Sequence, residues 1–337
     1  MSPEINHQIT LAARPDGYPN ESDFKQVESP VPQPGEGEVV VRTIWLSLDP
    51  YQRGRMRDAQ SYAVPVALGE VIVGGIVGRV VETRTPAFAV GDIVEGSLGW
   101  QDYGVSDGRN LRKVDTKLGP ISTAIGVLGM PGMTAYFGFL DVAEPKPGDT
   151  VVVSAASGAV GAIVGQISKI MGCRTVGIAG TQAKIDYIVD ELGFDVGINY
   201  KTENVASALA DACPQGIDVY FDNVGGPMTD AVLEQIAVGA RISICGQISQ
   251  YNVEEPEPGP RNLGLLVRNQ AKIQGFLVGQ FANRHEEARL RIAQWIREGR
   301  VKYKEDVVEG LENAPRAFIG LMRGENFGKL LIKVSDE

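Results

Sequence analysis

Hydrophobic residues follow two different patterns along the chain. Up to about residue 120 they form short β-branched runs, such as "EVVVRTIWLSL" and "GGIVGRVVET", which are separated by Gly- and Pro-rich turns. Runs of this kind are typical of short strands, and no long stretch has the 3.6-residue period of a helix. The pattern therefore predicts a β-rich N-terminal domain.

From Thr150 onwards, apolar runs alternate with amphipathic stretches. "TVVVSA" is predicted to be an apolar strand, and residues 158–171 a helix with one apolar face. Later strands are expected in "CRTVGIAG", "DVGINY", "GIDVYFDNVG", "ARISICGQ" and "KIQGFLV", with helical stretches between them. Apolar strands that alternate with helices indicate an α/β fold with a parallel sheet covered on both faces. Six such strands complete a doubly wound, dinucleotide-binding Rossmann sheet.

The end of the chain departs from this alternation. "NAPRAFIGLMRGENFGKLLIKV" predicts a short helix and then a strand, for which a six-stranded sheet has no further place. We therefore expect this segment to return to the β-rich domain. The expected organisation is a β-rich domain at 1–124, a dinucleotide-binding domain at 125–296 and the returning tail at 297–337.

Composition narrows the classes of partner. The net charge of −10, without a basic block, argues against nucleic acid as a partner. No apolar run approaches the roughly 18 residues that a membrane span needs, and the N-terminus lacks an apolar signal segment, so a cytoplasmic location is expected. Three cysteines that lie far apart in sequence, Cys173, Cys213 and Cys245, argue against a disulfide framework and a structural zinc site. A small-molecule substrate is the expected partner.

The turn "SAASGAVGAIVGQ" lies between the first predicted strand and helix of the second domain. Gly158 is expected to permit a tight turn that brings the N–H groups at the start of the helix to a pyrophosphate, and Gly161 to let the helix lie close to the strands. A turn that serves packing alone can have the same composition. The position between an apolar strand and an amphipathic helix favours a cofactor turn.

The stretch "GIAGTQAK" indicates which dinucleotide is bound. NAD-binding folds often have an Asp or Glu near this point for the ribose 2′-hydroxyl, whereas this chain has Gly180 and Thr181 and then Lys184. The small residues leave room for a 2′-phosphate, and a charge-assisted contact from Lys184 would contribute about 1.5–3 kcal/mol. The alternative is that Lys184 is a solvated helix residue. The missing acid favours NADP(H).

Several longer motifs together resemble one family. They are "LSLDPYQRGRM", "GVLGMPGMTAYFGFLDV", "GAVGAIVGQISKIMGCRTVGIAG", "FDNVGG", "CGQISQYN", "IQGF" and "GLENAPRAFIGLMRGENFGKLLIKV". Over nearly its whole length the chain resembles the zinc-free alkenal/one oxidoreductases of the medium-chain dehydrogenase/reductase superfamily. That family includes prostaglandin reductases, plant double-bond reductases and bacterial NADPH-dependent curcumin reductases. The resemblance implies a GroES-like β-rich domain, an inserted Rossmann domain and an active site in the cleft between them.

The resemblance also implies a set of cofactor-binding residues. The turn from Gly158 to Gly161 would meet the pyrophosphate, Lys184 and Tyr200 the 2′-phosphate, and residues 276–278 and Asn326 the nicotinamide. The full set is Met130, Thr134, Gly158, Ala159, Val160, Gly161, Gly180, Thr181, Lys184, Tyr200, Asn223, Cys245, Gly246, Gln247, Ile248, Ser249, Tyr251, Phe276, Leu277, Val278 and Asn326. From the residues alone, Asn223 could equally be a turn residue and 276–278 strand core.

Zinc-dependent members of the superfamily have a Cys ligand and a Gly-His-Glu segment, which this chain lacks. Ser47 and Leu48 occupy the first place, and Leu68 precedes Gly69 and Glu70 in the second. Without a thiolate and an imidazole we expect no metal. Gln52 also stands where the family's "DPYMR" motif has Met, a change in the substrate pocket that leaves the identity of the enone open.

Chemistry without metal favours hydride addition to the β-carbon of an enone or enal, because the charge spreads into an enolate that a few hydrogen-bond donors can stabilise. Candidate donors are the hydroxyls of Tyr251, Tyr51 and Tyr62 and the cofactor's ribose; each tyrosine could instead be a packed aromatic residue. The predicted activity is NADPH-dependent reduction of the double bond of α,β-unsaturated ketones and aldehydes. The alternatives are an NADPH quinone reductase and an NADPH-binding protein without turnover. A homodimer that pairs through "KIQGFLVGQ" is expected from the family.

Overall fold

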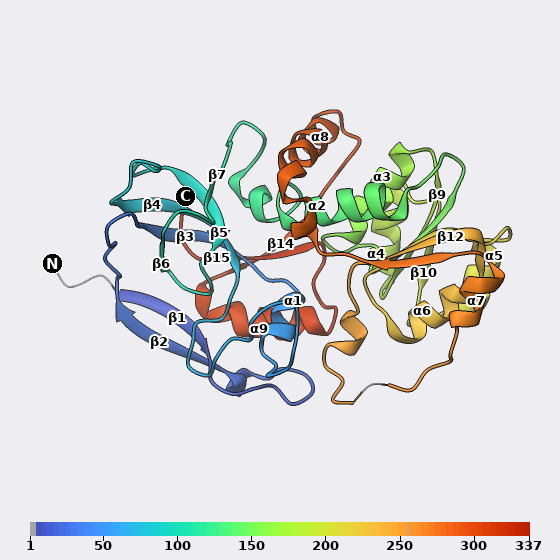
Figure 1. Cartoon of the computed structure of the whole chain (residues 1–337), viewed down its shortest axis with the longest axis horizontal. Coiled ribbons are helices and arrows are strands. Elements are labelled where there is room, and N and C mark those ends of the chain that lie inside the picture. Colours follow the sequence, from blue (N-terminus) through green and yellow to red (C-terminus); the bar gives the residue numbers. More distant parts are fainter. Residues whose placement is uncertain (1–4, 256) are drawn as a thin grey trace. The chain divides into compact units, whose positions relative to one another are not determined.

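The structure is a computed structural model that describes residues 5–255 and 257–337. The chain divides into two compact units (Figure 1). Unit 1 comprises Met1–Gly126 and Glu305–Glu337, and unit 2 comprises Val127–Lys304. Among the described residues, no helix is long and apolar enough to cross a membrane.

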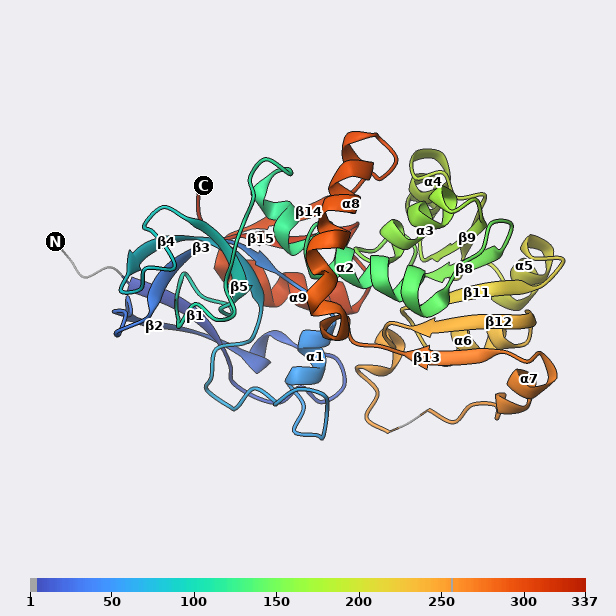
Figure 2. The ribbon, with the colours of Figure 1, turned by 45° about the horizontal axis from the view of Figure 1, so that its top comes forward.

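Unit 2 contains one six-stranded sheet with the order β10-β9-β8-β11-β12-β13 (Figure 2). Every neighbouring pair is parallel, which confirms the predicted doubly wound sheet. The strand order reverses between β8 and β11, and ligands bind at such a switch point beyond the carboxyl ends of the strands. The strands are β8 (Thr150–Ser154), β9 (Arg174–Ala179), β10 (Val196–Asn199), β11 (Ile217–Asp222), β12 (Ile236–Ile244) and β13 (Lys272–Gly275).

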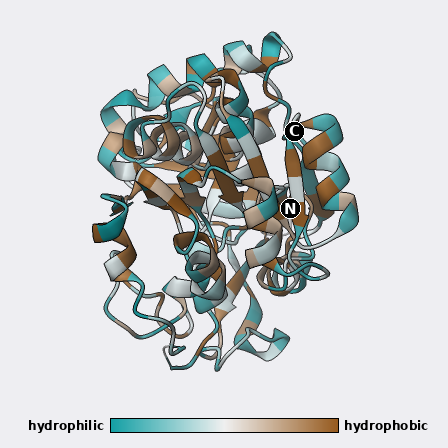
Figure 3. Cartoon of the chain, turned by 90° about the vertical axis from the view of Figure 1, so that its right-hand side faces the viewer, coloured by the Kyte–Doolittle hydropathy of each residue, from teal (hydrophilic) through white to brown (hydrophobic). Residues whose placement is uncertain are grey.

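Most helices of unit 2 bury an apolar face, and the central strands β8 and β11 are buried except for Thr150 and Asp218. Val151, Val152 and Val153 have no exposed surface, and the strands show the brown of hydrophobic residues in Figure 3. The helices are α2 (Met130–Phe137), α3 (Gly161–Ile170), α4 (Gln182–Asp186), α5 (Val205–Ala212), α6 (Gly226–Leu233), α7 (Leu263–Arg268) and α8 (His285–Arg297). The predicted helix at 158–171 begins only at Gly161, because residues 155–158 form a turn in which the Gly158 N–H donates to the Ala155 carbonyl at 2.9 Å.

Unit 1 is built from a hairpin and a larger sheet. Strands β1 (Ile5–Leu11) and β2 (Phe24–Pro30) pair with each other, and the larger sheet has the order β14-β15-β3-β4-β5-β7, with β6 pairing to β3. Its strands are β3 (Val39–Ser47), β4 (Gly75–Thr83), β5 (Ile93–Ser97), β6 (Tyr103–Ser106), β7 (Arg112–Lys113), β14 (Glu305–Glu309) and β15 (Lys329–Lys333). The short α1 (Tyr51–Arg55) follows β3, and α9 (Ala314–Met322) precedes β15.

The tail of the chain completes unit 1. Strand β15 pairs antiparallel with β3. Helix α9 supplies Phe318, whose ring packs edge-on against Trp100 with centroids 5.7 Å apart. Phe24 stacks on the same Trp100 ring. Residues from both ends of the chain therefore share one aromatic core.

Candidate functional site

The turn after β8 has the form of a cradle for a phosphate. Ala155 adopts a left-handed conformation with φ of 48°, and a Cβ on Gly161 would lie 2.4 Å from the Ala155 carbonyl oxygen. A Cβ on Gly158 would come only within 3.2 Å of that oxygen. The closest approach thus falls on Gly161, the glycine at which close packing of the helix is expected, and the left-handed backbone angle falls on Ala155.

This turn delivers the start of α3 to the switch point. Gly158, Ala159 and Val160 precede the helix and are partly exposed, whereas the body of α3 is buried. The first N–H groups of a helix have no partner within the helix and carry partial positive charge, so they suit a pyrophosphate. Because Gly161 has no Cβ, the start of α3 can lie close to the turn after β8, as a site for a pyrophosphate requires.

The end of β9 brings four of the predicted residues together. A Cβ on Gly180 would lie 2.9 Å from the ring of Tyr200, so these two residues are in direct contact. Thr181 is the N-cap of α4, and its hydroxyl accepts a hydrogen bond from the N–H of Lys184 at 3.3 Å. The end of β9 thus places Gly180 against Tyr200 and Thr181 at the start of α4, which contains Lys184. This arrangement fits a 2′-phosphate.

A buried carboxylate that sequence reasoning missed organises the switch point. Asp222 ends β11 with no exposed surface. Its Oδ1 accepts hydrogen bonds from the Tyr220 hydroxyl and from the N–H groups of Val224 and Gly225, each at 2.9 Å. Its Oδ2 accepts from the Thr229 hydroxyl at 2.5 Å. Because a buried acceptor is costly when it lacks donors, this set fixes the turn after β11.

Asn223 connects the two strands at the point where the order reverses. Its side-chain amide donates to the carbonyl of Ser154 at 2.8 Å, and its backbone N–H donates to the Ser154 hydroxyl at 2.9 Å. Ser154 ends β8, so Asn223 joins the ends of β8 and β11. The predicted position of Asn223 beside a cofactor is compatible with this location.

Residues 245–251 lie against the turn that follows β11. The N–H groups of Cys245 and Gly246 donate to the Asp222 carbonyl at 2.8 and 3.1 Å. The Ser249 hydroxyl donates to the Val224 carbonyl at 2.7 Å. The structure thus brings the predicted residue Asn223 close to the predicted loop 245–251, whose Ile248 N–H donates to the Asn223 carbonyl at 3.3 Å.

Tyr251 and Cys245 have different chemical environments within this loop. The Tyr251 hydroxyl accepts a hydrogen bond from the Gln247 N–H at 3.3 Å. The Cys245 side chain is only partly exposed, and burial, with a smaller effect of Asp222, raises the pKa of its thiol to about 12. A thiol with that pKa is uncharged at neutral pH and is not a nucleophile.

The remaining predicted residues of unit 2 lie in apolar or helical surroundings. Phe276 follows the end of β13 and is buried. Its ring packs directly against Gly138, where an added Cβ would lie only 2.2 Å from the ring. Leu277 is exposed, and the Val278 carbonyl accepts from the His285 ring at 3.1 Å. In α2, the Thr134 hydroxyl donates to the carbonyl of Met130 at 2.8 Å.

Tyr51 and Tyr62 lie near each other in unit 1. Burial, and then the charge of Asp49, raise the pKa of Tyr51 well above its usual range, and Tyr62 contributes in the same direction. Tyr62 itself is 65% exposed. Tyr51 therefore carries its proton at every ordinary pH and can act only as a hydrogen-bond donor or acceptor with its hydroxyl intact.

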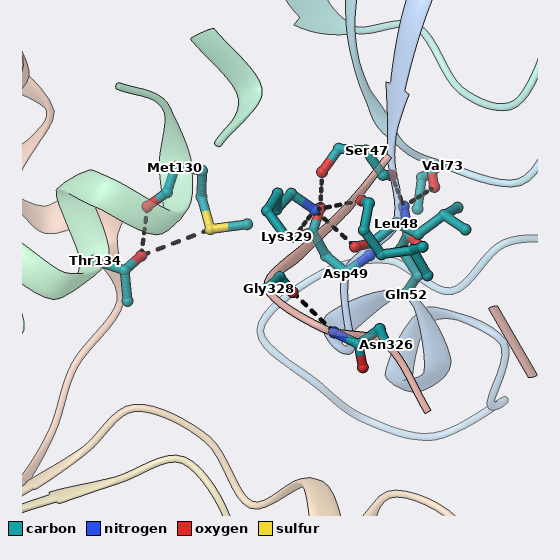
Figure 4. A network of polar contacts seen from close by, with 11 residues as sticks. Ser47, Leu48, Asp49, Gln52, Val73, Met130, Thr134, Asn326, Gly328 and Lys329 are labelled. Atoms are coloured by element: carbon teal, nitrogen blue, oxygen red, sulfur yellow. Dashed lines mark hydrogen bonds and ion pairs between the residues drawn. The ribbon is translucent and has the colours of Figure 1, made fainter. Parts of the chain in front are cut away.

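A second buried polar cluster precedes Tyr51 in unit 1 (Figure 4). The Lys329 ammonium donates to the carboxylate of Asp49 at 3.0 Å and to the carbonyls of Leu48 and Leu330 at 2.7 and 3.1 Å. The Ser47 hydroxyl donates to the other oxygen of Asp49. Ser47 and Leu48 stand where zinc-dependent relatives have a ligand. In this chain both residues are hydrogen-bonded to the Asp49–Lys329 ion pair.

Asn326 lies three residues before Lys329, and its side-chain amide donates to the Gly328 carbonyl at 2.9 Å (Figure 4). Across the residues that the structure describes, no group of three or more His, Cys, Asp or Glu side chains could hold a metal ion.

Comparisons with known proteins agree with this architecture. Residues 7–114 match the family model described as the N-terminal domain of oxidoreductase, and residues 159–295 match the model described as zinc-binding dehydrogenase. The chain is 48% identical to the NADPH-dependent curcumin reductase of Escherichia coli (strain K12), with 98% of each chain covered. It is 44% identical to the 2-alkenal reductase (NADP(+)-dependent) of Nicotiana tabacum, with 100% of each covered. The crystal structure of CurA in complex with NADPH from Vibrio vulnificus superposes with a TM-score of 0.94 at 47% identity and covers 98% of this chain and 100% of that chain.

Proposed function

The chain belongs to the medium-chain dehydrogenase/reductase family, and we propose that it uses NADPH to reduce carbon–carbon double bonds conjugated to a carbonyl group. The family resemblance predicted from the sequence is confirmed, and the protein is an enzyme, an NADP-dependent oxidoreductase. The single observation that supports the finer activity is the similarity, over nearly the whole chain, to a curcumin reductase and a 2-alkenal reductase. A 2-alkenal is by definition an α,β-unsaturated aldehyde.

The residues of unit 2 would hold the cofactor. We assign the pyrophosphate to the turn 158–161 and the first N–H groups of α3. The 2′-phosphate would lie beside Lys184 and Tyr200, whose ring packs against Gly180. Asn223 and the loop 245–251 would contact the remainder, and the other predicted cofactor residues, Asn326 of unit 1 included, stay part of this proposal.

Bound NADPH would supply a hydride from C4 of its nicotinamide. A hydroxyl of Tyr51, Tyr62 or Tyr251 would donate a hydrogen bond to the substrate's carbonyl oxygen, where negative charge develops as the hydride reaches the β-carbon. Tyr51 suits this role because its raised pKa keeps the proton in place. A proton from water, or from Tyr62 or Tyr251, then reaches the α-carbon, so the saturated product has gained one hydride and one proton.

The decisive experiment measures NADPH oxidation with a 2-alkenal, a chalcone-like enone and curcumin, alongside 1,4-naphthoquinone. We expect turnover with at least one conjugated carbonyl compound and a product whose double bond is saturated. Turnover with the quinone alone would instead identify a quinone reductase. Tight NADPH binding without oxidation of any compound would identify a binding protein.

The cofactor assignment has its own test. Lys184→Ala should raise the Kd for NADPH about tenfold or more, because one charge-assisted phosphate contact is lost, and leave that for NADH unchanged. Lys272→Ala is the control, because that lysine lies on β13 and pairs with Glu144 at 3.1 Å. Equal effects of Lys184→Ala on both coenzymes would contradict a 2′-phosphate site at this position.

We further propose that the protein is a homodimer that pairs through β13. This strand forms one edge of the sheet, and all four of its residues are exposed. Large apolar side chains nearby are also exposed, at 38% for Ile273, 72% for Leu263 and 83% for Val267. An apolar edge strand of this kind is normally covered, and a second copy related by a two-fold axis would extend the sheet. Light scattering should give a dimer mass, and Ile273→Lys should lower it to that of a monomer.

A further inference from the structure

Lys329 is the feature that the proposed chemistry leaves unexplained. It begins β15 and is only 4% exposed, and its partner Asp49 is 5% exposed. Glu305 lies opposite Lys329 in the register of β14 and β15, and the Glu305 carboxylate accepts from the Ser122 hydroxyl at 2.9 Å. Burial lowers the pKa of Lys329, while Asp49 and Glu305 act against that shift. A lysine is almost never buried unless it is paired, so we asked what the buried ammonium of Lys329 holds in place.

The contacts of Lys329 show that it cannot act on a substrate directly. An ammonium group has three N–H donors. The Leu48 carbonyl, the Asp49 carboxylate and the Leu330 carbonyl accept one each, at 2.7, 3.0 and 3.1 Å. No donor is left for a carbonyl oxygen of a substrate, so any role of Lys329 in the reaction acts through the groups that it holds.

Those groups form the turn that leads into α1. Gln52 completes it: the Asp49 N–H donates to the Gln52 side-chain oxygen at 3.0 Å, and the Gln52 amide donates to the carbonyls of Ser47 and Val73 at 3.0 and 3.1 Å (Figure 4). Tyr51 is the first residue of α1 and follows Asp49 by two positions. Hydrogen bonds from Lys329 of β15 and from Gln52 of α1 thus fix the turn, and Tyr51 lies within the segment that they fix.

We propose that Lys329 is a positioning residue of the reductase, whose ammonium fixes the turn 47–52 and thereby the place of the Tyr51 hydroxyl. This inference rests on the proposed function, because it assigns Tyr51 to the group of tyrosines that contact the substrate. In this arrangement Asp49 neutralises the buried ammonium of Lys329.

The test is a double-mutant cycle between Lys329 and Tyr51. Lys329→Met should lower kcat for the best enone about tenfold or more and leave the Kd for NADPH within about twofold. Tyr51→Phe should lower kcat as well, and the double variant should be no slower than Tyr51→Phe alone, within about twofold. Lys333→Met is the matched control on the same strand, since that ammonium pairs with Asp336 at 2.9 Å near the surface; it should leave kcat unchanged. Additive losses, or an unchanged kcat in Lys329→Met, would overturn the proposal.

Two further measurements keep the outcome clear. If Lys329→Met does not fold, the same cycle can be measured in the Asp49→Asn/Lys329→Met background, because both charges of the Asp49–Lys329 pair are then removed together. Hydrogen exchange of residues 47–55 needs no turnover, and we expect about tenfold faster exchange in Lys329→Met than in wild type or Lys333→Met. Unchanged exchange would refute the positioning role. A wild type that reduces no enone would refute the proposed function and leave the exchange result to decide on Lys329.

Discussion

The two units stabilise a buried carboxylate in contrasting ways. In unit 2, Asp222 is surrounded by neutral donors, and most of them lie within seven residues of it along the chain. In unit 1, Asp49 faces the full charge of Lys329, which is 280 residues away in sequence. The Asp222 cluster has neutral donors that are mostly close in sequence. The Asp49 cluster contains an ion pair between residues that are distant in sequence.

This difference determines how each cluster responds to substitution. Neutral donors lose part of their interaction when a carboxylate becomes an amide, but nothing is left charged and unpaired. An ion pair that loses one partner leaves a buried charge, and this costs more than the pair contributed. A single substitution in the ionic cluster should therefore lower the free energy of unfolding more than one in the neutral cluster. Replacing both partners of the ion pair should lower it less than replacing one.

The largest effect is expected for Lys329→Met. Removing the ammonium leaves the buried Asp49 carboxylate unpaired, and the free energy of unfolding should fall by about 3–5 kcal/mol. Asp49→Asn/Lys329→Met should regain at least half of that loss, because both charges are gone. Urea unfolding followed by circular dichroism measures both variants. A double variant as unstable as the single one would show that the carbonyl contacts of Lys329, and not the charge pair, dominate.

A smaller effect is expected for Asp222→Asn in unit 2. Oδ1 stays an acceptor for the Val224 and Gly225 N–H groups, and the Thr229 hydroxyl can rotate to accept from the new amide. Since hydrogen bonds to a charged acceptor become neutral ones, the free energy of unfolding should fall by about 1–3 kcal/mol. The same urea titration applies. A loss as large as that of Lys329→Met would remove the distinction between the two clusters.

The contrast also explains what the sequence could predict. The six parallel strands and the switch point follow from alternating apolar strands and helices, whereas Asn223 is implied by the family resemblance. Asp222, its neighbour, was missed although its signal is local: an acid that ends an apolar strand, followed by a turn with two glycines. Nothing near Lys329 indicates burial, because its partner lies at the other end of the chain and a lysine at the start of a strand is usually solvated.

Backbone conformation set a second limit. Glycine is the usual residue at a positive φ, so the turn after β8 was assigned to Gly158. The structure has Ala155 in the left-handed region and places the steric demand on Gly161. Which residue of a Gly- and Ala-rich turn takes an unusual angle depends on how the helix packs on its strands, and sequence spacing does not contain that information.

The unequal steric demand at Gly161 and Gly158 gives a matched pair of variants. A Cβ at Gly161 would meet a backbone oxygen at 2.4 Å, so Gly161→Ala must displace the turn itself, and we expect the Kd for NADPH to rise about tenfold, or about 1.4 kcal/mol. Gly158→Ala meets the same oxygen at 3.2 Å and should change the Kd by less than about threefold. Fluorescence titration of NADPH measures both. A larger effect of Gly158→Ala would return the steric role to that residue.

The smallest effect is expected where a similar ion pair lies at the surface. Arg109 contacts Asp107 at 2.5 Å in unit 1, but its side chain is 85% exposed. Water already solvates both charges and salt screens them, so Arg109→Ala should shift the Tm by less than about 1 °C. A thermal melt beside that of Lys329→Met tests whether burial, rather than the presence of opposite charges, makes the Asp49–Lys329 pair sensitive. A shift comparable to that of Lys329→Met would mean that charge pairing alone stabilises unit 1, and the contrast between its ionic cluster and the neutral one of unit 2 would then not depend on burial.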